Sequence, residues 1–434
     1  MEWFSQPIIR GGLGIFTLLG ICWLFSLKRR RVNWLLVAAG IGLQVGVALL
    51  VLKVGWVATA LEGVSHFFLF LLQFSEEGSI FLFGETLVQD PSFGASFAFK
   101  VLPSIVFFSA FASMLYYLGV LQKIVLLFAW VMNRSMRLSG AESVSAAANI
   151  FIGQTEAPLM VKPYLERMTR SEILCLMTGG MATIAGAVLV AYMEFLGGSD
   201  PEMKVAVGKR LLMASIMAAP GAIVCAKILL PETREVQRNL HIPRADIGTN
   251  LVDAITRGTT QGVKLAVNVG AILLVFKALI SLGNFVVFDG VGTWTGLNEI
   301  IQAKTDGAYE GLTLQFVFGL FFAPIAWVIG VEPGSLLFAG QLLGEKLVLN
   351  EFIAYISLSE MLQEGIIVEQ KTIVICTFAL CGFANLSSMG IQIGGISVLA
   401  PGQRKNLARL APRALIGGTI ASLLSACIAG ALIG

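Results

Sequence analysis

Long apolar segments separated by short polar connections make up most of the 434-residue chain. Several of these segments reach the roughly 20 residues that an α-helix needs to cross a hydrocarbon core about 30 Å thick. The apolar runs are continuous and do not alternate with period two, which excludes a membrane β-barrel. The pattern predicts an all-α polytopic membrane protein with about eight transmembrane helices. The predicted crossings are 10–27, 33–53, 96–119, 171–196, 205–229, 265–288, 371–398 and 414–433.

Three apolar segments differ from a simple crossing, and a hydrophilic linker carries a further, amphipathic piece. Segment 57–74 is interrupted by Glu62, Gly63 and His66, which favours a helix at the membrane interface. Segments 141–165 and 313–358 each carry polar residues in their centre and are predicted to be re-entrant helical hairpins. The hydrophilic stretch 230–264 is predicted to be a cytoplasmic linker that ends in an amphipathic helix.

The first hairpin is predicted from the stretch 149–158, Asn-Ile-Phe-Ile-Gly-Gln-Thr-Glu-Ala-Pro. Irregular backbone at membrane depth requires cover by protein or by a water-filled cavity. An ionisable residue at that depth is a candidate functional residue. A structural alternative is that Glu156 only pairs with a basic residue, but the adjacent amide and hydroxyl favour a binding role. The polar residues bracketed by Gly153 and Pro158 are Gln154, Thr155 and Glu156.

The second half of the chain repeats this plan. The second hairpin contains Asn350-Glu351-Phe352, and each hairpin is followed by a helix with a centre of small residues, at 179–186 and at 382–390. The first hairpin is expected to enter from the inside and the second from the outside. Inverted repeats of this kind are typical of secondary transporters, which bind their substrate near the membrane midplane between discontinuous helices.

The polar residues of the two repeats indicate the chemistry of the substrate. They supply two carboxylates, two amides, two hydroxyls and an aromatic ring, and no obvious strong cation. Carboxylates accept strong hydrogen bonds from hydroxyl groups, and an amide can both donate and accept. A neutral, hydroxyl-rich solute is therefore favoured over an anion. The residues are Glu156, Glu351, Gln154, Asn385, Thr155, Ser388 and Phe383.

Composition and charge support a membrane protein and set its orientation. Only 13% of the residues are charged and the mean hydropathy is +0.82, whereas soluble domains carry about 25% charged residues. The basic residues are dispersed, so a nucleic-acid partner is not expected, and the His and Cys residues form no metal or cofactor motif. The positive-inside rule places the N-terminus outside. The basic clusters expected inside are 28–31, 134–137, 167–170, 234–244 and 404–413, with Lys204, Lys209 and Arg210 as exceptions.

Five motifs closely resemble those of the concentrative nucleoside transporter family, in its bacterial eight-helix form, and the resemblance covers essentially the whole chain. The motifs are FLFGE at 81–85, SAAANIF at 145–151, GQTEAP at 153–158, NEFIAY at 350–355 and ALCGFANLSSMG at 379–390. The resemblance implies a homotrimer in which each subunit has a fixed scaffold and a mobile transport domain that moves like an elevator. The implied scaffold elements are 1–56, 96–138 and 265–288, and the implied transport elements are 57–95, 139–229 and 313–434.

The resemblance also implies roles for individual residues. The implied substrate-binding residues are Gln154, Thr155, Glu156 and Val188 for the base, and Glu351, Phe383, Asn385 and Ser388 for the ribose. The implied sodium ligands, mostly through backbone carbonyls, are Asn149, Ile152, Thr183 and Ile184. Thr183 replaces a serine of related carriers and Ile152 replaces a valine. Proton-coupled relatives depart from this pattern around Asn149.

The sequence therefore predicts a sodium-driven symporter of nucleosides such as uridine, in a bacterial inner membrane, with sodium as coupling ion and no other cofactor. Three alternatives remain at this point. Uptake could be coupled to protons, or the solute could be another neutral polar molecule. An intramembrane enzyme could use Glu156 and Glu351 as paired acids, although no nucleophile or metal set accompanies them.

Overall fold

The computed structural model describes residues 7–89, 97–198, 200–237 and 249–433, and over these ranges the chain is helical without a strand. Eight helical segments in these ranges are long and apolar enough to cross a membrane. The prediction of an all-α polytopic membrane protein is thereby confirmed. The segments are α1 Pro7–Leu24, α2 Trp34–Lys53, α3 Gly55–Phe83, α5 Phe97–Tyr117, the pair α9 Arg170–Ala182 and α10 Gly186–Gly197, α11 Pro201–Leu229, α12 Leu251–Asn284 and α20 Arg404–Ile433.

Two segments of the chain differ from what the sequence indicated. Residues 57–74 form part of α3, a helix of 29 residues that extends beyond the predicted segment and is long and apolar enough to cross a membrane. The Nζ atom of Lys209 lies 2.6 Å from Oε1 of Glu62, so the carboxylate that interrupts this apolar run forms an ion pair. The predicted crossing 371–398 is two shorter helices, α18 Gln370–Leu380 and α19 Leu386–Leu399.

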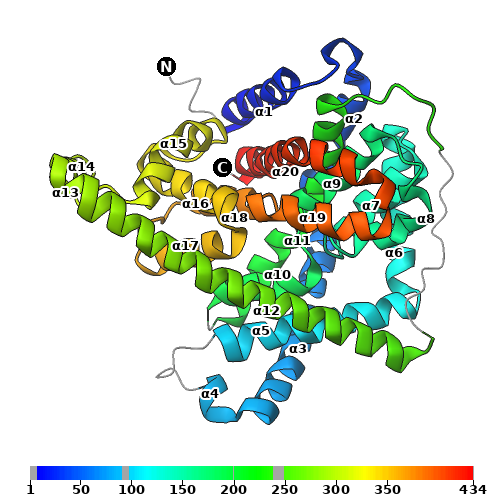
Figure 1. The fold of residues 1–434 in the computed structure, drawn as a ribbon, viewed down its shortest axis with the longest axis horizontal. Helices are drawn as coiled ribbons and strands as arrows, with labels where there is room; N and C mark the ends of the chain where they lie inside the picture. The colour runs from blue at the N-terminus through cyan, green and yellow to red at the C-terminus, as the bar shows by residue number, and fades with distance from the viewer. Residues whose placement is uncertain (1–6, 90–96, 199, 238–248, 434) are drawn as a thin grey trace.

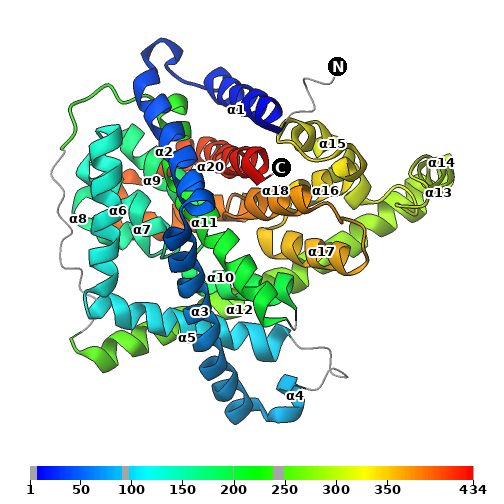
Figure 2. The ribbon, with the colours of Figure 1, turned by 180° about the vertical axis from the view of Figure 1, so that it is seen from behind.

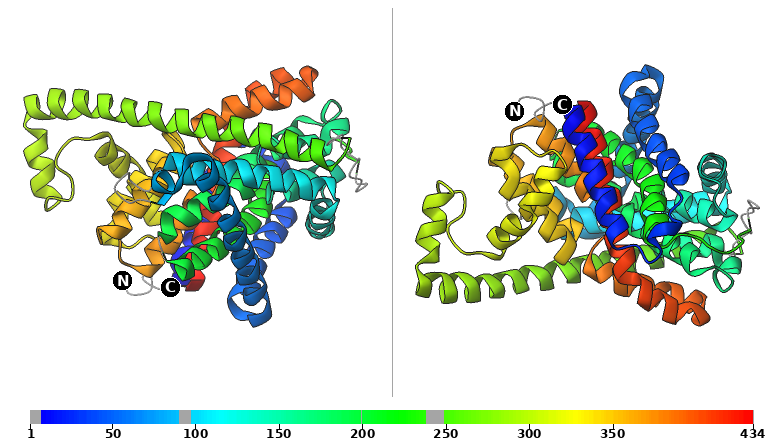
Figure 3. Two further views of the ribbon diagram at one scale, coloured as in Figure 1. Left: turned by 90° about the horizontal axis from the view of Figure 1, so that it is seen from below. Right: turned by 90° about the horizontal axis from the view of Figure 1, so that it is seen from above.

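The core is formed by α9, α10, α11 and α20. In the most apolar stretch of α11, 94% of the residues are buried, whereas in the corresponding stretches of α3 and α12 only 17% are buried. The long helix α12 crosses the front of the molecule alongside α5 (Figure 1). On the opposite face α2 and α3 follow each other beside α11 (Figure 2), and α1 packs along α20 (Figure 3). The outer helices therefore present apolar surface to lipid or to another subunit.

Two glycines allow α12 to approach α5 closely. A Cβ atom added to Gly258 would lie 2.6 Å from the Cβ of Ser113, and one added to Gly262 would lie 2.7 Å from the Cα of Val106. Glycines four residues apart lie on one face of a helix, which is the spacing that brings membrane helices together.

The helix pairs α9–α10 and α18–α19 are interrupted where the sequence is rich in small residues. The backbone of Thr183 is extended, with φ −113° and ψ 168°, and Gly382 has a φ of 138°, a region that other residues rarely adopt. The two interruptions touch, because the N–H of Phe383 donates to the carbonyl of Thr183 over 3.3 Å. A Cβ at Gly382 would lie 2.6 Å from the carbonyl oxygen of Ala182.

Each interrupted pair is accompanied by a helix-turn-helix. The first consists of α7 Gly140–Asn149, an irregular turn, η4 Ala157–Val161 and α8 Lys162–Leu165. The second consists of α16 Leu336–Val348 and α17 Glu351–Gln363, and α15 Leu314–Val328 packs against α16. The remaining elements are η2 Arg29–Arg31, α4 Glu85–Gln89, α6 Val120–Met136, η5 Phe285–Gly292, α13 Thr293–Thr295, α14 Leu297–Lys304, η6 Pro333–Ser335 and η7 Pro401–Gln403.

Candidate functional site

One cavity of about 350 Å³ lies where the two helix turns and the two helix interruptions meet. The turn after α7 contributes residues from one side, and the start of α17 and the α18–α19 interruption contribute from the other. All eight residues implied to bind substrate line this cavity. They are Gln154, Thr155, Glu156, Val188, Glu351, Phe383, Asn385 and Ser388.

Glu351 is the first residue of α17, and its buried carboxylate is held on both oxygens. Asn385 donates its Nδ2 hydrogen to Oε2 over 2.8 Å, and Tyr192 donates its hydroxyl to Oε1 over 3.2 Å. Asn350 begins α17 as its cap, with its side chain accepting from the N–H of Ile353. Since each carboxylate oxygen has a further lone pair, Glu351 can still accept hydrogen bonds from ligand hydroxyls.

Three consecutive polar residues at the turn after α7 face the cavity with different exposure. Gln154 is buried and donates its Nε2 hydrogen to the hydroxyl of Ser388 over 3.0 Å. Thr155 is exposed and Glu156 is half-buried. Among the described residues no basic side chain forms an ion pair with Glu156. The alternative in which Glu156 serves only as a structural partner for a basic residue therefore has no support.

The side chains of Val188 and Phe383 give the cavity apolar walls. Val188 comes from the first turns of α10 and is buried, and Phe383 lies half-buried within the α18–α19 interruption. A small-molecule site typically combines apolar surface with a few placed polar groups. This cavity can therefore hold a ligand with a planar ring and several hydroxyl groups.

The sequence analysis missed several polar residues at this site, among them Ser109, Asn350 and Ser387, which line the cavity. Tyr192 holds Glu351, and three side chains of α12 line the cavity: Gln261, Lys264 and Asn268. The three are spaced by three and four residues and so share one helix face, a signal that the sequence carries. Lys264 also corrects the expectation that the site has no strong cation, since its side chain lines the same cavity as Glu351.

The four implied sodium ligands lie beside this cavity, at the first turn and the α9–α10 interruption, and all four are buried. The side-chain oxygen Oδ1 of Asn149 is buried without a hydrogen-bond partner, while its Nδ2 donates to the carbonyl of Ser145 over 2.9 Å. The hydroxyl of Thr183 donates to the carbonyl of Gly179 over 3.0 Å, which leaves its oxygen lone pairs free.

Backbone carbonyls complete this group of oxygens. In the described part of the chain, the backbone carbonyls of Ile152 and Ile184 accept no backbone hydrogen bond. No cluster of three or more His, Cys, Asp or Glu side chains that could hold a metal occurs in the same ranges. Neutral oxygens without charged ligands suit a hard monovalent cation better than a transition metal.

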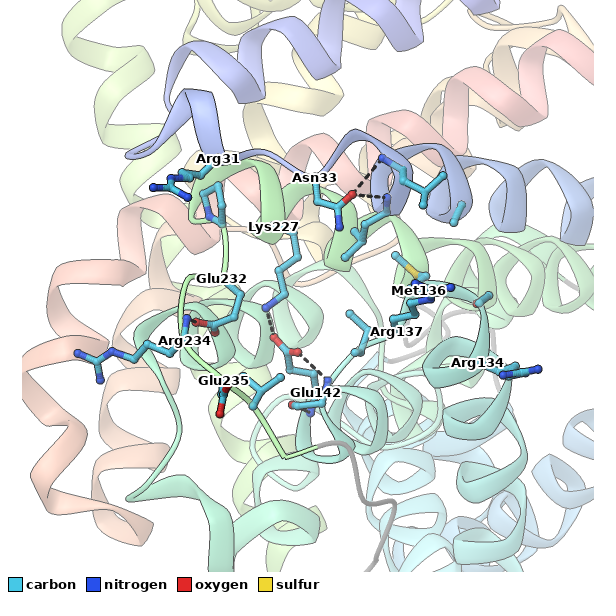
Figure 4. Close-up of a pocket in the computed structure, with 18 residues that line it drawn as sticks. Arg31, Asn33, Arg134, Met136, Arg137, Glu142, Lys227, Glu232, Arg234 and Glu235 are labelled. Carbon is cyan, nitrogen blue, oxygen red and sulfur yellow. Dashed lines mark hydrogen bonds and ion pairs between the residues drawn. The ribbon is translucent and has the colours of Figure 1, made fainter.

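A larger cavity of about 860 Å³ contains none of the predicted site residues. Figure 4 shows at its centre the buried ion pair between Lys227 of α11 and Glu142 of α7, while the labelled arginines point away from that pair. Partial burial alone would raise the pKa of Glu232 at its rim, but hydrogen bonds from Thr169 and from the N–H of Arg234 outweigh burial and lower it. Because its basic groups diverge and its central charges are paired, we assign ligand binding to the smaller cavity.

Comparison with known protein families covers most of the chain. Residues 210–430 match the family described as the C-terminus of Na⁺ dependent nucleoside transporters. Residues 13–86 match the N-terminus of the same transporters, and residues 98–199 match a family described as nucleoside recognition.

Individual relatives show the same similarity. An uncharacterized transporter of Haemophilus influenzae is 41% identical, covering 99% of this chain and 99% of the relative. Sodium/nucleoside cotransporter 1 of Mus musculus is 38% identical, covering 96% of this chain and 63% of the relative. The solved structure of CNTnw in an inward-facing substrate-bound state has a TM-score of 0.88 at 39% identity, covering 99% of this chain and 98% of that chain.

Proposed function

Because the chain belongs to the Na⁺-dependent nucleoside transporter family, we propose that it carries nucleosides such as uridine into the cell by sodium-driven symport. Members of this family are transporters, so the protein is a multi-pass membrane transporter and not an enzyme, and sodium is the coupling ion of the family. The finer proposal is that one nucleoside and its coupling sodium bind side by side at the centre of the protein.

The observation that carries this proposal is the convergence of eight residues on one cavity. They come from segments that are distant in sequence and belong to both repeats, and they supply the acceptors, donors and apolar walls that a ribose and a base require. Glu351 and Asn385 are assigned to the ribose hydroxyls because a held carboxylate accepts strongly from hydroxyls. Gln154 and Val188 are assigned to the base.

The buried oxygens of Asn149 and Thr183 support sodium over protons as the driving ion. A proton-coupled carrier needs a group that titrates, whereas these residues do not titrate and instead offer lone pairs. Asn149 ends α7 and Thr183 lies at the interruption of α9–α10, the kind of site at which transporter half-helices coordinate ions. Ion and substrate sites therefore share the turn after α7, which gives a direct route for coupling.

An elevator-type alternating-access mechanism in a homotrimer is part of the proposal. The scaffold would comprise 1–56, 96–138 and 265–288, and the moving domain 57–95, 139–229 and 313–434, joined through 230–264. The close packing of α5 against α12 through Gly258 and Gly262 supports a rigid scaffold. The low burial of α12 supports its use as a surface for other subunits. The membrane is proposed to be the bacterial inner membrane, with the N-terminus outside.

Uptake into proteoliposomes tests this function. Purified protein should accumulate labelled uridine when an inward sodium gradient is imposed, and not when choline replaces sodium. If uptake were driven only by a pH gradient, the transporter would be coupled to protons and the proposal of sodium coupling would be wrong. If amino acids or free ribose inhibited uptake of labelled uridine and other nucleosides did not, nucleosides would not be the substrate class of this transporter.

A further inference from the structure

A second buried glutamine stands directly behind Gln154. Gln392 of α19 is 1% exposed and does not line the cavity. Its Nε2 lies 3.0 Å from Oε1 of Gln154 and 3.1 Å from the backbone carbonyl oxygen of Met177. We propose that Gln392 is a positioning residue that fixes the amide of Gln154, so that position 154 presents an N–H donor to the nucleobase. This inference rests on the proposed function.

The direction of both amides follows from one backbone group. The carbonyl of Met177 can only accept, so the part of the Gln392 amide that faces it must be the NH₂ group. The second hydrogen of that NH₂ group then points to Gln154, whose side-chain oxygen must accept it. The opposite orientation of Gln154 would set two NH₂ groups against each other.

The remaining groups of Gln154 are determined by the same arrangement. Its Nε2 donates one hydrogen to the hydroxyl of Ser388 over 3.0 Å. The main-chain N–H of Ser388 is itself held by Oδ1 of Asn385 at 2.8 Å, so the position of Ser388 is set by the cap of α19. The second hydrogen on Nε2 of Gln154 is left for a ligand in the cavity.

Gln392 has no other polar role in the described structure. Its Oε1 is buried without a hydrogen-bond partner, a cost that its two donated bonds offset. Space for the contact depends on Gly180 of α9. A Cβ atom there would lie 2.6 Å from Nε2 of Gln392 and 2.9 Å from Cβ of Gln154. The helix thus leaves room for two amides to meet.

This arrangement affects specificity, because the site should favour bases that carry a hydrogen-bond acceptor. Without Gln392, the amide of Gln154 could rotate and present either its oxygen or its nitrogen. With Gln392, a ring that carries a carbonyl or an unprotonated ring nitrogen gains a hydrogen bond, and a ring without either does not.

The test compares two ligands that share ribose. Uridine has acceptors on its ring, whereas a phenyl C-riboside has none. Gln392→Met keeps the size of the side chain but removes the amide. We expect the dissociation constant of uridine to rise about three- to tenfold, the effect of one neutral hydrogen bond, and that of the phenyl riboside to change by less than about twofold.

Two further variants make the result specific. Gln154→Leu should produce the same selective loss for uridine, and adding Gln392→Met to it should cause no further loss, because coupled residues are not additive. Gln403→Met is the matched control, since Gln403 is a buried glutamine that donates to the carbonyls of Leu165 and Met168 away from Gln154. It should leave the ratio of the two dissociation constants unchanged.

The outcomes separate this inference from the proposed function. Equal weakening of both ligands by Gln392→Met, or no change in uridine binding, would overturn the positioning role while a selective effect of Gln154→Leu upheld the site. If Gln154→Leu also had no selective effect, the assignment of Gln154 to the base would fall and the inference with it.

Discussion

Asn385 donates its Nδ2 hydrogen to Oε2 of Glu351 over 2.8 Å, and with its Oδ1 it accepts from the N–H of Ser388 over 2.8 Å. Both ends of this one amide are therefore used, which fixes its orientation. The contact joins the start of α17 to the start of α19, two half-helices that begin within the candidate site. The three polar residues that we propose to bind the ribose, Glu351, Asn385 and Ser388, thus form one connected group.

Replacing Glu351 by Gln should reduce uridine affinity by roughly tenfold or more, because hydrogen bonds to a charged group contribute about 1.5–3 kcal/mol each. A deoxyribose nucleoside that lacks the hydroxyl bound by Glu351 should lose less. Isothermal titration of uridine and deoxyuridine isomers against both proteins measures the difference.

Glu345→Gln is the control for this change. Glu345 is a buried acid on α16 that accepts from Nε2 of Gln341 and does not line the cavity. Its replacement should leave uridine affinity within about twofold of the parent. Equal uridine affinity in the parent and in Glu351→Gln would remove Glu351 from the site.

Tyr192→Phe should weaken uridine binding about three- to tenfold, since the carboxylate of Glu351 loses one of its two fixed donors. The control is Tyr355→Phe. Tyr355 is equally buried, and the centroid of its ring lies 4.4 Å from that of Tyr192. Its hydroxyl, however, donates to the carbonyl of Thr377. Both variants should lower the melting temperature, and only Tyr192→Phe should change affinity. Equal effects on affinity would make Tyr192 a packing residue only.

Asn149→Ala and Thr183→Ala should raise the sodium concentration needed for half-maximal uridine binding, while affinity at saturating sodium changes less. Each variant removes one oxygen from the proposed ion site. Thr377→Ala is the control, because the hydroxyl of Thr377 donates to the carbonyl of Ile373 over 2.7 Å, the same local bond that Thr183 makes to Gly179. Uridine binding measured across a sodium titration distinguishes them, and an unshifted midpoint in both variants would argue against this ion site.

The predicted orientation can be checked by labelling introduced cysteines. Arg30 and Lys53 are both exposed, and all six native cysteines are buried. With the N-terminus outside and with α1 and α2 crossing the membrane, Lys53→Cys should react with an impermeant thiol reagent applied to intact cells, and Arg30→Cys should react only after the cells are opened. The reverse pattern would invert the orientation and the directions of both hairpins.

The polar residues of the candidate site that the sequence identified share one feature: they interrupt an apolar pattern. Gly153 and Pro158 mark the first turn, and Gly382 marks the second interruption, because such residues are out of place in a continuous membrane helix. The structure places the first turn and the α18–α19 interruption where these residues indicated, and the hydrogen bond from Phe383 to Thr183 joins the α18–α19 interruption to that of α9–α10.

The residues that the sequence did not identify lie within regular helices. Tyr192 lies within α10 and Gln392 within α19, and their partners depend on helix rotation and on packing between distant segments. Lys264 belongs to a polar face of α12 that becomes part of the site only because α12 passes the cavity. The length of α3 was underestimated because Glu62 is paired with Lys209, which the sequence does not reveal.

The central claim, that nucleoside and sodium bind as a coupled pair, is tested most directly by uridine affinity in the purified protein during a sodium titration. Choline should replace sodium at constant ionic strength and fixed pH. The dissociation constant of uridine should fall as sodium rises, and uridine should strengthen sodium binding by the same factor, because coupling between two sites is reciprocal. An affinity that stays flat across the titration, with uptake that follows the pH gradient, would contradict the account.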